Sequence, residues 1–375
     1  MLNEAEQMEL VAELQHCCEE TGQVARDLLD WYDRERRDLP WRYGPGEAAD
    51  PYRVWLSEIM LQQTTVRTVI PYFEKFTTLW PTVGDLAKVD EEAVLQAWAG
   101  LGYYSRARNL LKAARIIVKS YQSSFPAKYN QAIEIPGIGP YSASAILSVA
   151  YQQPYSAVDG NVIRVISRLF IIKSDIRLTK TLQTIKKKAD LLLDKNNPGA
   201  FNEAVMELGA TICTPKKPRC LSCPVNNLCK AFEKRSTINI PFKSPAKAKQ
   251  KKYQIICILK HNSKILIGQN PQNGLLAGMW ELPAIETSQK QFENGFKALL
   301  IEKKIIVKSE STIFRHIYSH IDLKYKAIIA DVDNKKRLFD QYVNHKWVEL
   351  KESENYAIHN AHRKVFEWYK NELNN

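Results

Sequence analysis

Apolar and polar residues alternate with a helical period through most of the first 250 residues. Asp50 and Pro51 form a good N-cap and N1 pair, and they predict a helix running on through VWLSEIMLQQTTVRTVIPYFEKF. Similar patterns predict helices at 25–40, 83–88, 91–99, 105–121, 130–134, 141–151, 160–170, 179–194 and 199–210. No convincing strand precedes residue 250. The pattern therefore indicates an all-helical first domain.

The pattern changes after a segment rich in proline, alanine and lysine, RSTINIPFKSPAKAKQKK, at 235–252. This composition is typical of a linker and of a basic, DNA-facing segment. Beyond it, strands are expected at 253–259, 264–268, 327–331 and 345–350, with helices near 289–303 and 358–373. The predicted organisation is a helical extension at 1–24, a helical domain at 25–234, the linker, and an α+β domain at 253–375.

The central motif of the chain is a tight turn, Pro136-Gly137-Ile138-Gly139-Pro140, followed by a helix. Gly137 and Gly139 can take positive φ or let another backbone come close, and Pro140 suits a first helical turn. Two helices joined by such a hairpin leave free N–H groups at a helix N-terminus, which is a phosphate-binding arrangement. Asp159 is expected to cap the next helix and to present a carboxylate nearby. A purely structural turn with a capping aspartate is the alternative.

Composition narrows the class of protein. A hydrophobic content of 45% with 25% charged residues is that of an ordinary globular protein, and no run reaches membrane-spanning length. The net charge of +12 favours a polyanionic partner, although a basic surface that serves solubility is an alternative. The acidic N-terminus resembles neither a signal nor a transit peptide. We therefore expect a cytoplasmic protein with no membrane association.

Seven cysteines, four of them clustered, suggest a reducing compartment and a metal site rather than disulfides. The cluster has the spacing C-x6-C-x2-C-x5-C, formed by Cys213, Cys220, Cys223 and Cys229. Four thiolates at this spacing suit either tetrahedral zinc or a [4Fe–4S] cluster, and the spacing alone does not separate them. Neighbouring lysines and arginines indicate that this loop also contacts phosphate.

Glu58 lies within a largely apolar predicted helix. A carboxyl group in such surroundings has a raised pKa and suits general acid catalysis. From the residues alone, a surface glutamate on an amphipathic helix is at least as good an interpretation.

Three further motifs separate these interpretations: LPWR at 39–42, PYRVWLSEIMLQQT at 51–64 and GLGYYSRARNL at 100–110. Together with PGIG, Asp159 and the four cysteines, they resemble the A/G-specific adenine DNA glycosylases, the MutY family of the helix-hairpin-helix superfamily. The resemblance implies a helix-hairpin-helix glycosylase domain and a [4Fe–4S] cluster. It also implies a monomeric, nucleoid-associated enzyme of base excision repair. Its expected substrate is double-stranded DNA with adenine opposite 8-oxoguanine or guanine.

The resemblance also implies roles for single residues. Glu58 would protonate adenine N7, Asp159 would stabilise the sugar cation, and Asn161 would support Asp159 or the attacking water. Tyr141 stands where strand-cutting relatives carry a lysine nucleophile, so we expect a monofunctional enzyme. The remaining substrate contacts would be an adenine pocket of Trp41, Arg42 and Glu203, and a wedge of Gln63 and Tyr103 with Leu101 beside them. Core packing is the alternative for Leu101.

The segment GLLAGMWELP at 274–283 resembles the Nudix-like domain appended to these glycosylases. Residues 284–305 lack the glutamate cluster that holds magnesium in catalytic Nudix proteins, so this domain is expected to recognise rather than hydrolyse. Arg315 to His320 matches the loop that recognises 8-oxoguanine, usually F-S-H. Here Tyr318 replaces the phenylalanine, followed by Ser319 and His320 as predicted lesion contacts.

Two other functions remain open at this point. One is a different base excision enzyme, such as a thymine-mismatch or oxidised-pyrimidine glycosylase. The second is a non-catalytic iron–sulfur protein that binds mispairs or senses redox state. The set of Glu58, Tyr141 and Asp159 favours the adenine glycosylase over both.

Overall fold

The computed structural model describes residues 4–44, 46–245, 248–274, 276–294, 300, 305–318, 320–332 and 339–374. The chain divides into two compact units. The first consists of Met1–Lys88 with Asn109–Pro245, and the second of Val89–Arg108 with Ala246–Asn375. The domain limits expected from the sequence remain predictions, and the limit after residue 24 falls inside a single long helix.

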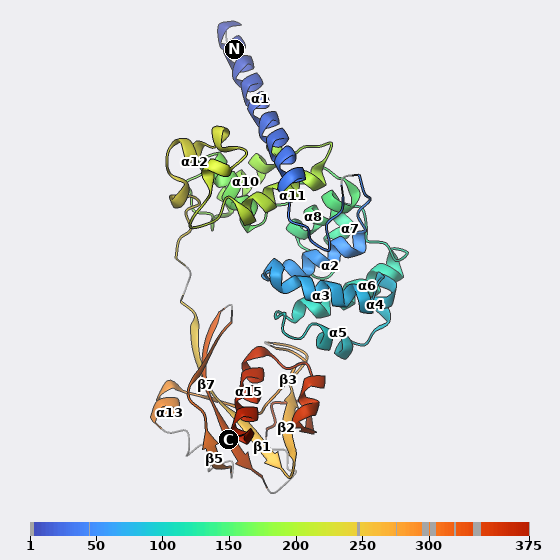
Figure 1. Ribbon diagram of the computed structural model, residues 1–375, viewed down its shortest axis with the longest axis vertical. Coiled ribbons are helices and arrows are strands. Elements are labelled where there is room, and N and C mark those ends of the chain that lie inside the picture. Colours follow the sequence, from blue (N-terminus) through green and yellow to red (C-terminus); the bar gives the residue numbers. More distant parts are fainter. Residues whose placement is uncertain are drawn as a thin grey trace. The chain divides into compact units, whose positions relative to one another are not determined.

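Helices form the chain up to residue 245, and Figure 1 shows the first of them extending away from its neighbours. Their bounds are α1 Glu4–Glu35, α2 Pro51–Leu61, α3 Val66–Leu79, α4 Val83–Lys88, α5 Glu91–Ala97, α6 Ser105–Ser120, α7 Tyr129–Ala132, α8 Pro140–Tyr151, α9 Gly160–Leu169, α10 Thr179–Leu192, α11 Pro198–Thr211 and α12 Lys230–Glu233. Short 3-10 turns occur at Cys220–Ser222, Asn226–Leu228 and Thr237–Asn239. Within residues 4–44 and 46–245 there is no strand, which confirms the predicted helical class.

Two predicted helices are wrong in extent. The helix expected at 25–40 begins as early as Glu4 and ends at Glu35. The helix that begins after Asp50 ends at Leu61, and α3 begins at Val66. Between them Gln63 has φ of +57°, a left-handed conformation that no helix continues through. The polar run Gln-Gln-Thr-Thr interrupts the apolar stripe, and its two β-branched threonines favour helix less than the residues on either side.

Helix α11 occupies the centre of the helical packing, since it contacts α1, α8 and α9. Its approach to α9 depends on Gly209, because a Cβ there would lie 2.5 Å from the Cβ of Asn161. Buried side chains of α1, α9 and α11, among them Leu28, Val165 and Leu208, form one hydrophobic cluster around this contact. The contact thus holds the N-terminus of α9 against α11.

The C-terminal part contains a mixed sheet. Its strands are β1 Gln250–His261, β2 Lys264–Gln269, β3 Trp280–Glu281, β4 Ala284–Thr287, β5 Ile306–Glu310, β6 Phe314–Ile317, β7 Ile321–Asp331 and β8 Asn344–Glu349. The main order is β3-β2-β1-β7-β5, with β4 on β1, β6 on β7 and β8 on β2. The pair β1–β7 is parallel and the other pairs are antiparallel. The predicted α+β class is confirmed.

Strand β1 is buried on both faces, which explains its continuous apolar run. Ile256 and Ile258 belong to the cluster that includes Val365 of α15 (Asn360–Asn374). Cys257 and Leu259 belong to the cluster on the other face, with Phe292 of α13 (Gln289–Asn294). The short strands β3 to β6 were not predicted. Most of the helix expected at 289–303 lies outside the described residues.

No helix among the described residues is long and apolar enough to cross a membrane.

We expect Gly209→Ala to destabilise the helical unit. The added methyl group would overlap Asn161, and overpacking of this kind typically costs about 1–3 kcal/mol. Gly160→Ala is the matched control, because a Cβ there meets nothing within 4 Å. Urea unfolding of both variants measures the difference. Equal loss in both variants would contradict the packing argument.

Candidate functional site

A cleft of about 960 Å³ lies between α2, α8, α11 and the loop after α1. Most of the catalytic and base-contacting residues predicted for the helical domain line it together. They are Trp41, Arg42, Glu58, Gln63, Tyr141, Asp159, Asn161 and Glu203. The fold therefore gathers, into one cavity, side chains that are far apart in the sequence.

Glu58 lies on α2 between turns that are buried in the core, such as those of Trp55 and Met60. Its Oε2 atom is buried and has no hydrogen-bond partner among the described residues. Burial raises the pKa of Glu58 to about 8, the negative charge of Asp159 adds to this, and a hydrogen bond with Tyr141 opposes it. The interpretation of Glu58 as a surface glutamate is wrong. A carboxyl group in this environment is protonated in neutral solution.

Asp159 is the N-cap of α9, as predicted, and accepts a hydrogen bond from the Val162 amide at 2.7 Å. The Asn161 Nδ2 atom donates to its other oxygen at 2.8 Å. Burial raises the pKa of Asp159, while these two donors and the charge of Arg164 oppose the rise. Its negative form thus has two donors and a helix N-terminus to stabilise it, whereas Glu58 lies in the middle of α2, away from any helix N-terminus.

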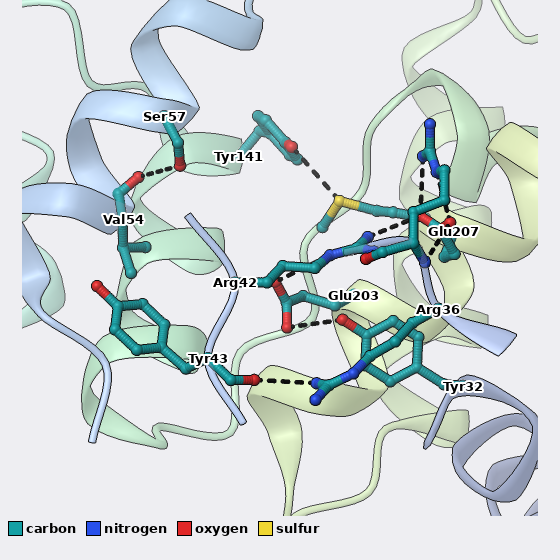
Figure 2. A network of polar contacts seen from close by, with 11 residues as sticks. Tyr32, Arg36, Arg42, Tyr43, Val54, Ser57, Tyr141, Glu203 and Glu207 are labelled. Carbon is teal, nitrogen blue, oxygen red and sulfur yellow. Dashed lines mark hydrogen bonds and ion pairs between the residues drawn. The ribbon is translucent and has the colours of Figure 1, made fainter. Parts of the chain in front are cut away.

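Tyr141 is the second residue of α8. Its hydroxyl donates to the Met206 sulfur at 3.7 Å, as Figure 2 shows. Burial and the neighbouring charges of Glu58 and Asp159 raise the pKa of Tyr141 well above its usual value. The side chain is therefore a neutral phenol beside the two carboxyl groups.

The glycine hairpin precedes this helix. Gly137 has φ of +85°, and a Cβ there would lie 3.1 Å from the Asn109 Cβ, so both conformation and space favour glycine. Gly139 instead is extended, with φ of −104°, and forms the N-cap of α8 ahead of Pro140. A Cβ at Gly139 would meet nothing within 4 Å, which leaves this face of the hairpin open.

The predicted adenine pocket forms one wall of the cleft. The Tyr32 hydroxyl donates to Glu203 Oε2 at 3.1 Å, and Arg42 Nε lies 4.0 Å from Glu203 Oε1 (Figure 2). Burial raises the pKa of Glu203. Trp41 is buried and packs edge-on against Phe73, with ring centroids 5.3 Å apart.

Sequence reasoning missed three residues of this wall: Tyr32, Arg37 and Glu207. Glu207 has a fully buried side chain that binds both Arg37 and Arg42. The signal was present in the sequence, because Glu203 and Glu207 are four residues apart on the otherwise apolar helix α11. Two carboxyl groups on one turn of a buried helix require partners.

The predicted wedge residues differ in exposure. Gln63 and Tyr103 are exposed and have positive φ, whereas Leu101 is 5% exposed, which favours its alternative role in packing. Arg106 Nη2 donates to the carbonyls of Leu101 and Gly102, and its guanidinium lies 5.6 Å from the Tyr103 ring centroid. The loop that carries Tyr103 is thus held by a buried arginine.

In the C-terminal part, Tyr318 is half-buried and its hydroxyl lies 3.3 Å from Nδ1 of His359. The other ring nitrogen of His359 lies 3.2 Å from Glu281. The hydroxyl that replaces the usual phenylalanine edge is therefore engaged inside the domain. His320 is exposed, and Ser319 lies outside the described residues.

The four predicted cysteine ligands are free thiols that line one small cavity. Burial raises the pKa of Cys223 to about 12 and also raises the pKa of Cys229. Arg168 donates to the Cys213 sulfur at 3.3 Å. Buried thiols are held as thiolates by a bound metal centre, so the donor set fits a metal cofactor.

Three family models match the chain. Residues 56–190 match the HhH-GPD superfamily base excision DNA repair proteins, and residues 254–368 match the NUDIX domain. Residues 213–229, which hold the four cysteines, match the iron-sulfur binding domain of endonuclease III. The chain thus carries the iron–sulfur cofactor expected from its cysteines.

Relatives that match most of the chain support the same family. Adenine DNA glycosylase of Rattus norvegicus is 34% identical over 92% of this chain and 77% of its own length. Adenine DNA glycosylase of Buchnera aphidicola (subspecies Schizaphis graminum) is 32% identical over 92% of this chain and 97% of its own. The structure of a thermostable thymine-DNA glycosylase covers 58% of this chain and 98% of its own, with 28% identity and a TM-score of 0.52. On this evidence the chain belongs to the adenine DNA glycosylase family, the DNA base excision repair enzymes with an iron–sulfur cluster and a C-terminal Nudix domain.

Proposed function

We propose that this chain removes adenine paired with 8-oxoguanine, and less tightly adenine paired with guanine, without cutting the DNA backbone. The observation that carries the proposal is the pair of carboxyl groups in the cleft. One oxygen of Glu58 has no hydrogen-bond partner among the described residues, whereas Asp159 accepts two hydrogen bonds at a helix N-terminus. Because their surroundings differ, one of two such carboxyl groups keeps its proton and acts as an acid, while the other is an anion.

In the proposed reaction the flipped adenine enters the cleft and Glu58 protonates its N7. Protonation makes the base a better leaving group, so the N-glycosidic bond breaks with oxocarbenium character in the sugar. The anionic Asp159 stabilises this cation, as one carboxylate does in sugar hydrolases. Asn161, which already donates to Asp159, orients that carboxylate or the water that completes the abasic site.

Monofunctional action follows from the phenol at position 141. Backbone cleavage by β-elimination needs an amine that forms a Schiff base with the sugar. Tyr141 offers no amine, and its raised pKa keeps the phenol neutral. Its proposed role is to hydrogen-bond within the catalytic site beside Glu58.

Base flipping requires groups that fill the gap in the duplex. Exposed Gln63 and Tyr103 are proposed for this role, and the positive φ of each presents a side chain from a turn. The open face at Gly139 and the basic cysteine loop are proposed to contact phosphates, in line with the net charge of +12. We propose a monomer that acts in the cytoplasm on nucleoid DNA.

The Nudix domain is proposed to read 8-oxoguanine through Tyr318, Ser319 and His320. The hydroxyl of Tyr318 has a partner in His359, so the ring rather than the hydroxyl is the group offered to the lesion. Tyr318 is then proposed to act through its aromatic ring, by stacking.

The first test is excision of adenine opposite 8-oxoguanine from a duplex, with and without alkali. We expect strand scission only after alkali. Glu58→Gln should slow single-turnover excision about 10²–10⁴-fold, because it removes the general acid, while binding is retained. The exposed Glu74→Gln is the matched control. Scission without alkali would reveal a lyase nucleophile, and binding without any product would favour the mispair-binding protein.

The pH profile gives a second test. Excision needs protonated Glu58, so kcat/KM should fall as the pH rises through about 8, where this carboxyl loses its proton. It should also fall at low pH, as Asp159 becomes protonated. Substituting Glu58 by Gln should abolish the fall at high pH in whatever activity remains. A flat wild-type profile between pH 6 and about 9.5 would contradict the acid role.

A third test addresses the lesion reader. Tyr318→Ala should reduce the preference for 8-oxoguanine over guanine opposite adenine about 5- to 150-fold, since base stacking on an aromatic ring is worth about 1–3 kcal/mol. Tyr318→Phe keeps the ring and should leave the preference within about 2-fold of wild type. A large loss in the phenylalanine variant would show that the hydroxyl itself reads the lesion.

A further inference from the structure

Glu207 is a buried carboxylate in the wall of the cleft that the proposed reaction leaves without a role. Its side chain has no exposed surface and lies one turn after Glu203 on α11. Arg37 binds it through two atoms, Nε at 2.6 Å and Nη2 at 2.8 Å. Arg42 Nη2 binds the same carboxylate at 2.6 Å, as Figure 2 shows.

This arrangement fixes both guanidinium groups. A buried carboxylate is stable only with charged partners, and two short charge-assisted bonds with Arg37 supply one of them. Arg42 has further constraints, because Nη1 donates to the Arg37 carbonyl at 2.8 Å and its guanidinium lies 5.4 Å from the Tyr32 ring centroid. The hydrogen bonds and the charge of these arginines hold the pKa of Glu207 below its usual value against the effect of burial.

The fixed position of Arg42 limits the hydrogen bonds that Glu203 can accept. Arg42 is the cation in ion-pair range of this carboxyl, yet its Nε stays 4.0 Å from Oε1, beyond hydrogen-bond distance. Among the described residues, the hydrogen bond that Glu203 accepts comes from the neutral Tyr32 hydroxyl, on Oε2. Oε1 is thus left without a hydrogen bond on the side of the cleft.

We propose that Glu207 is a positioning residue for base selection. By binding both arginines it keeps Arg42 from forming a hydrogen bond with Glu203, and so leaves Glu203 Oε1 as an acceptor for the exocyclic amino group of the base. The inference rests on the proposed excision of adenine.

Without Glu207, Arg42 is free to turn to Glu203. The wall would then present a hydrogen-bond donor where it now presents an acceptor. A donor suits a base with a carbonyl at position 6, and hypoxanthine differs from adenine at this position while keeping the N7 that Glu58 protonates. The ratio of adenine to hypoxanthine excision therefore isolates the effect of Glu207 from that of the acid.

The test uses the full chain with its cluster and single-turnover excision of adenine or hypoxanthine placed opposite 8-oxoguanine. Glu207→Gln should lower the adenine to hypoxanthine ratio about tenfold or more, because hydrogen bonds to charged groups are worth about 1.5–3 kcal/mol. Glu74→Gln should leave the ratio unchanged. If Glu207→Gln slows both bases equally, the residue is only structural and the proposal is wrong.

A double variant keeps the test informative if Glu207→Gln does not fold. This variant carries Glu207→Gln together with Arg42→Gln. It removes the Arg42 guanidinium, which would otherwise be a buried charge without its carboxylate partner and would form a hydrogen bond with Glu203. Because Arg42 itself lines the proposed adenine pocket, the double variant is compared with Arg42→Gln alone. In that background Glu207→Gln should change the adenine to hypoxanthine ratio by less than about threefold, since no Arg42 is left to turn to Glu203. A fall of about tenfold in the absence of Arg42 would overturn the proposal. A wild-type protein that excises no adenine would instead refute the proposed function on which it rests.

Discussion

The close approach of α9 and α11 determines where Asp159 lies relative to the carboxyl groups of α11. Gly209 leaves no room for a side chain against Asn161, so the N-terminus of α9, with Asp159 as its cap, is held beside α11. Helix α11 in turn carries Glu203, Met206 and Glu207 into the cleft. The carboxylate proposed to stabilise the sugar cation and the proposed base-binding wall are thereby fixed relative to each other by backbone packing rather than by flexible side chains.

Four carboxyl groups share this cleft, and their surroundings give them different charges. One buried oxygen of Glu58 has no hydrogen-bond partner among the described residues and this carboxyl favours its neutral form, while Glu207 lies between two arginines and favours its anion. Asp159 and Glu203 are buried with partial compensation, from a helix N-terminus in one case and from a phenol and an arginine in the other. Repulsion between the groups strengthens the division, because the charge of Asp159 helps to keep the proton on Glu58.

Much of the helical framework was predictable, because apolar residues at helical spacing and caps such as Asp50 and Asp159 are local signals. The break at Gln63 was missed because the apolar stripe resumes after it. The ion pair between Arg37 and Glu207 was also missed, because the two residues lie 170 positions apart and no local sequence pattern predicts their contact. The short strands β3 to β6, such as the two-residue Trp280–Glu281, carry too few residues for an alternation to be recognised. The glycosylase motifs pointed to the residues proposed to react, but the surroundings that set their protonation come from tertiary packing.

These long-range contacts also affect how the protein folds during its synthesis. Tyr32 with Glu203, and Arg37 with Glu207, join positions 171 and 170 residues apart. Contacts of such separation form late, because the intervening chain must be ordered before they repay the entropy of closing the loop. During synthesis, the segment that carries Glu58 leaves the ribosome well before α11, which carries Glu203 and Glu207. A nascent chain therefore has no assembled base pocket until α11 has left the ribosome, and the enzyme becomes competent only once its helical unit is complete.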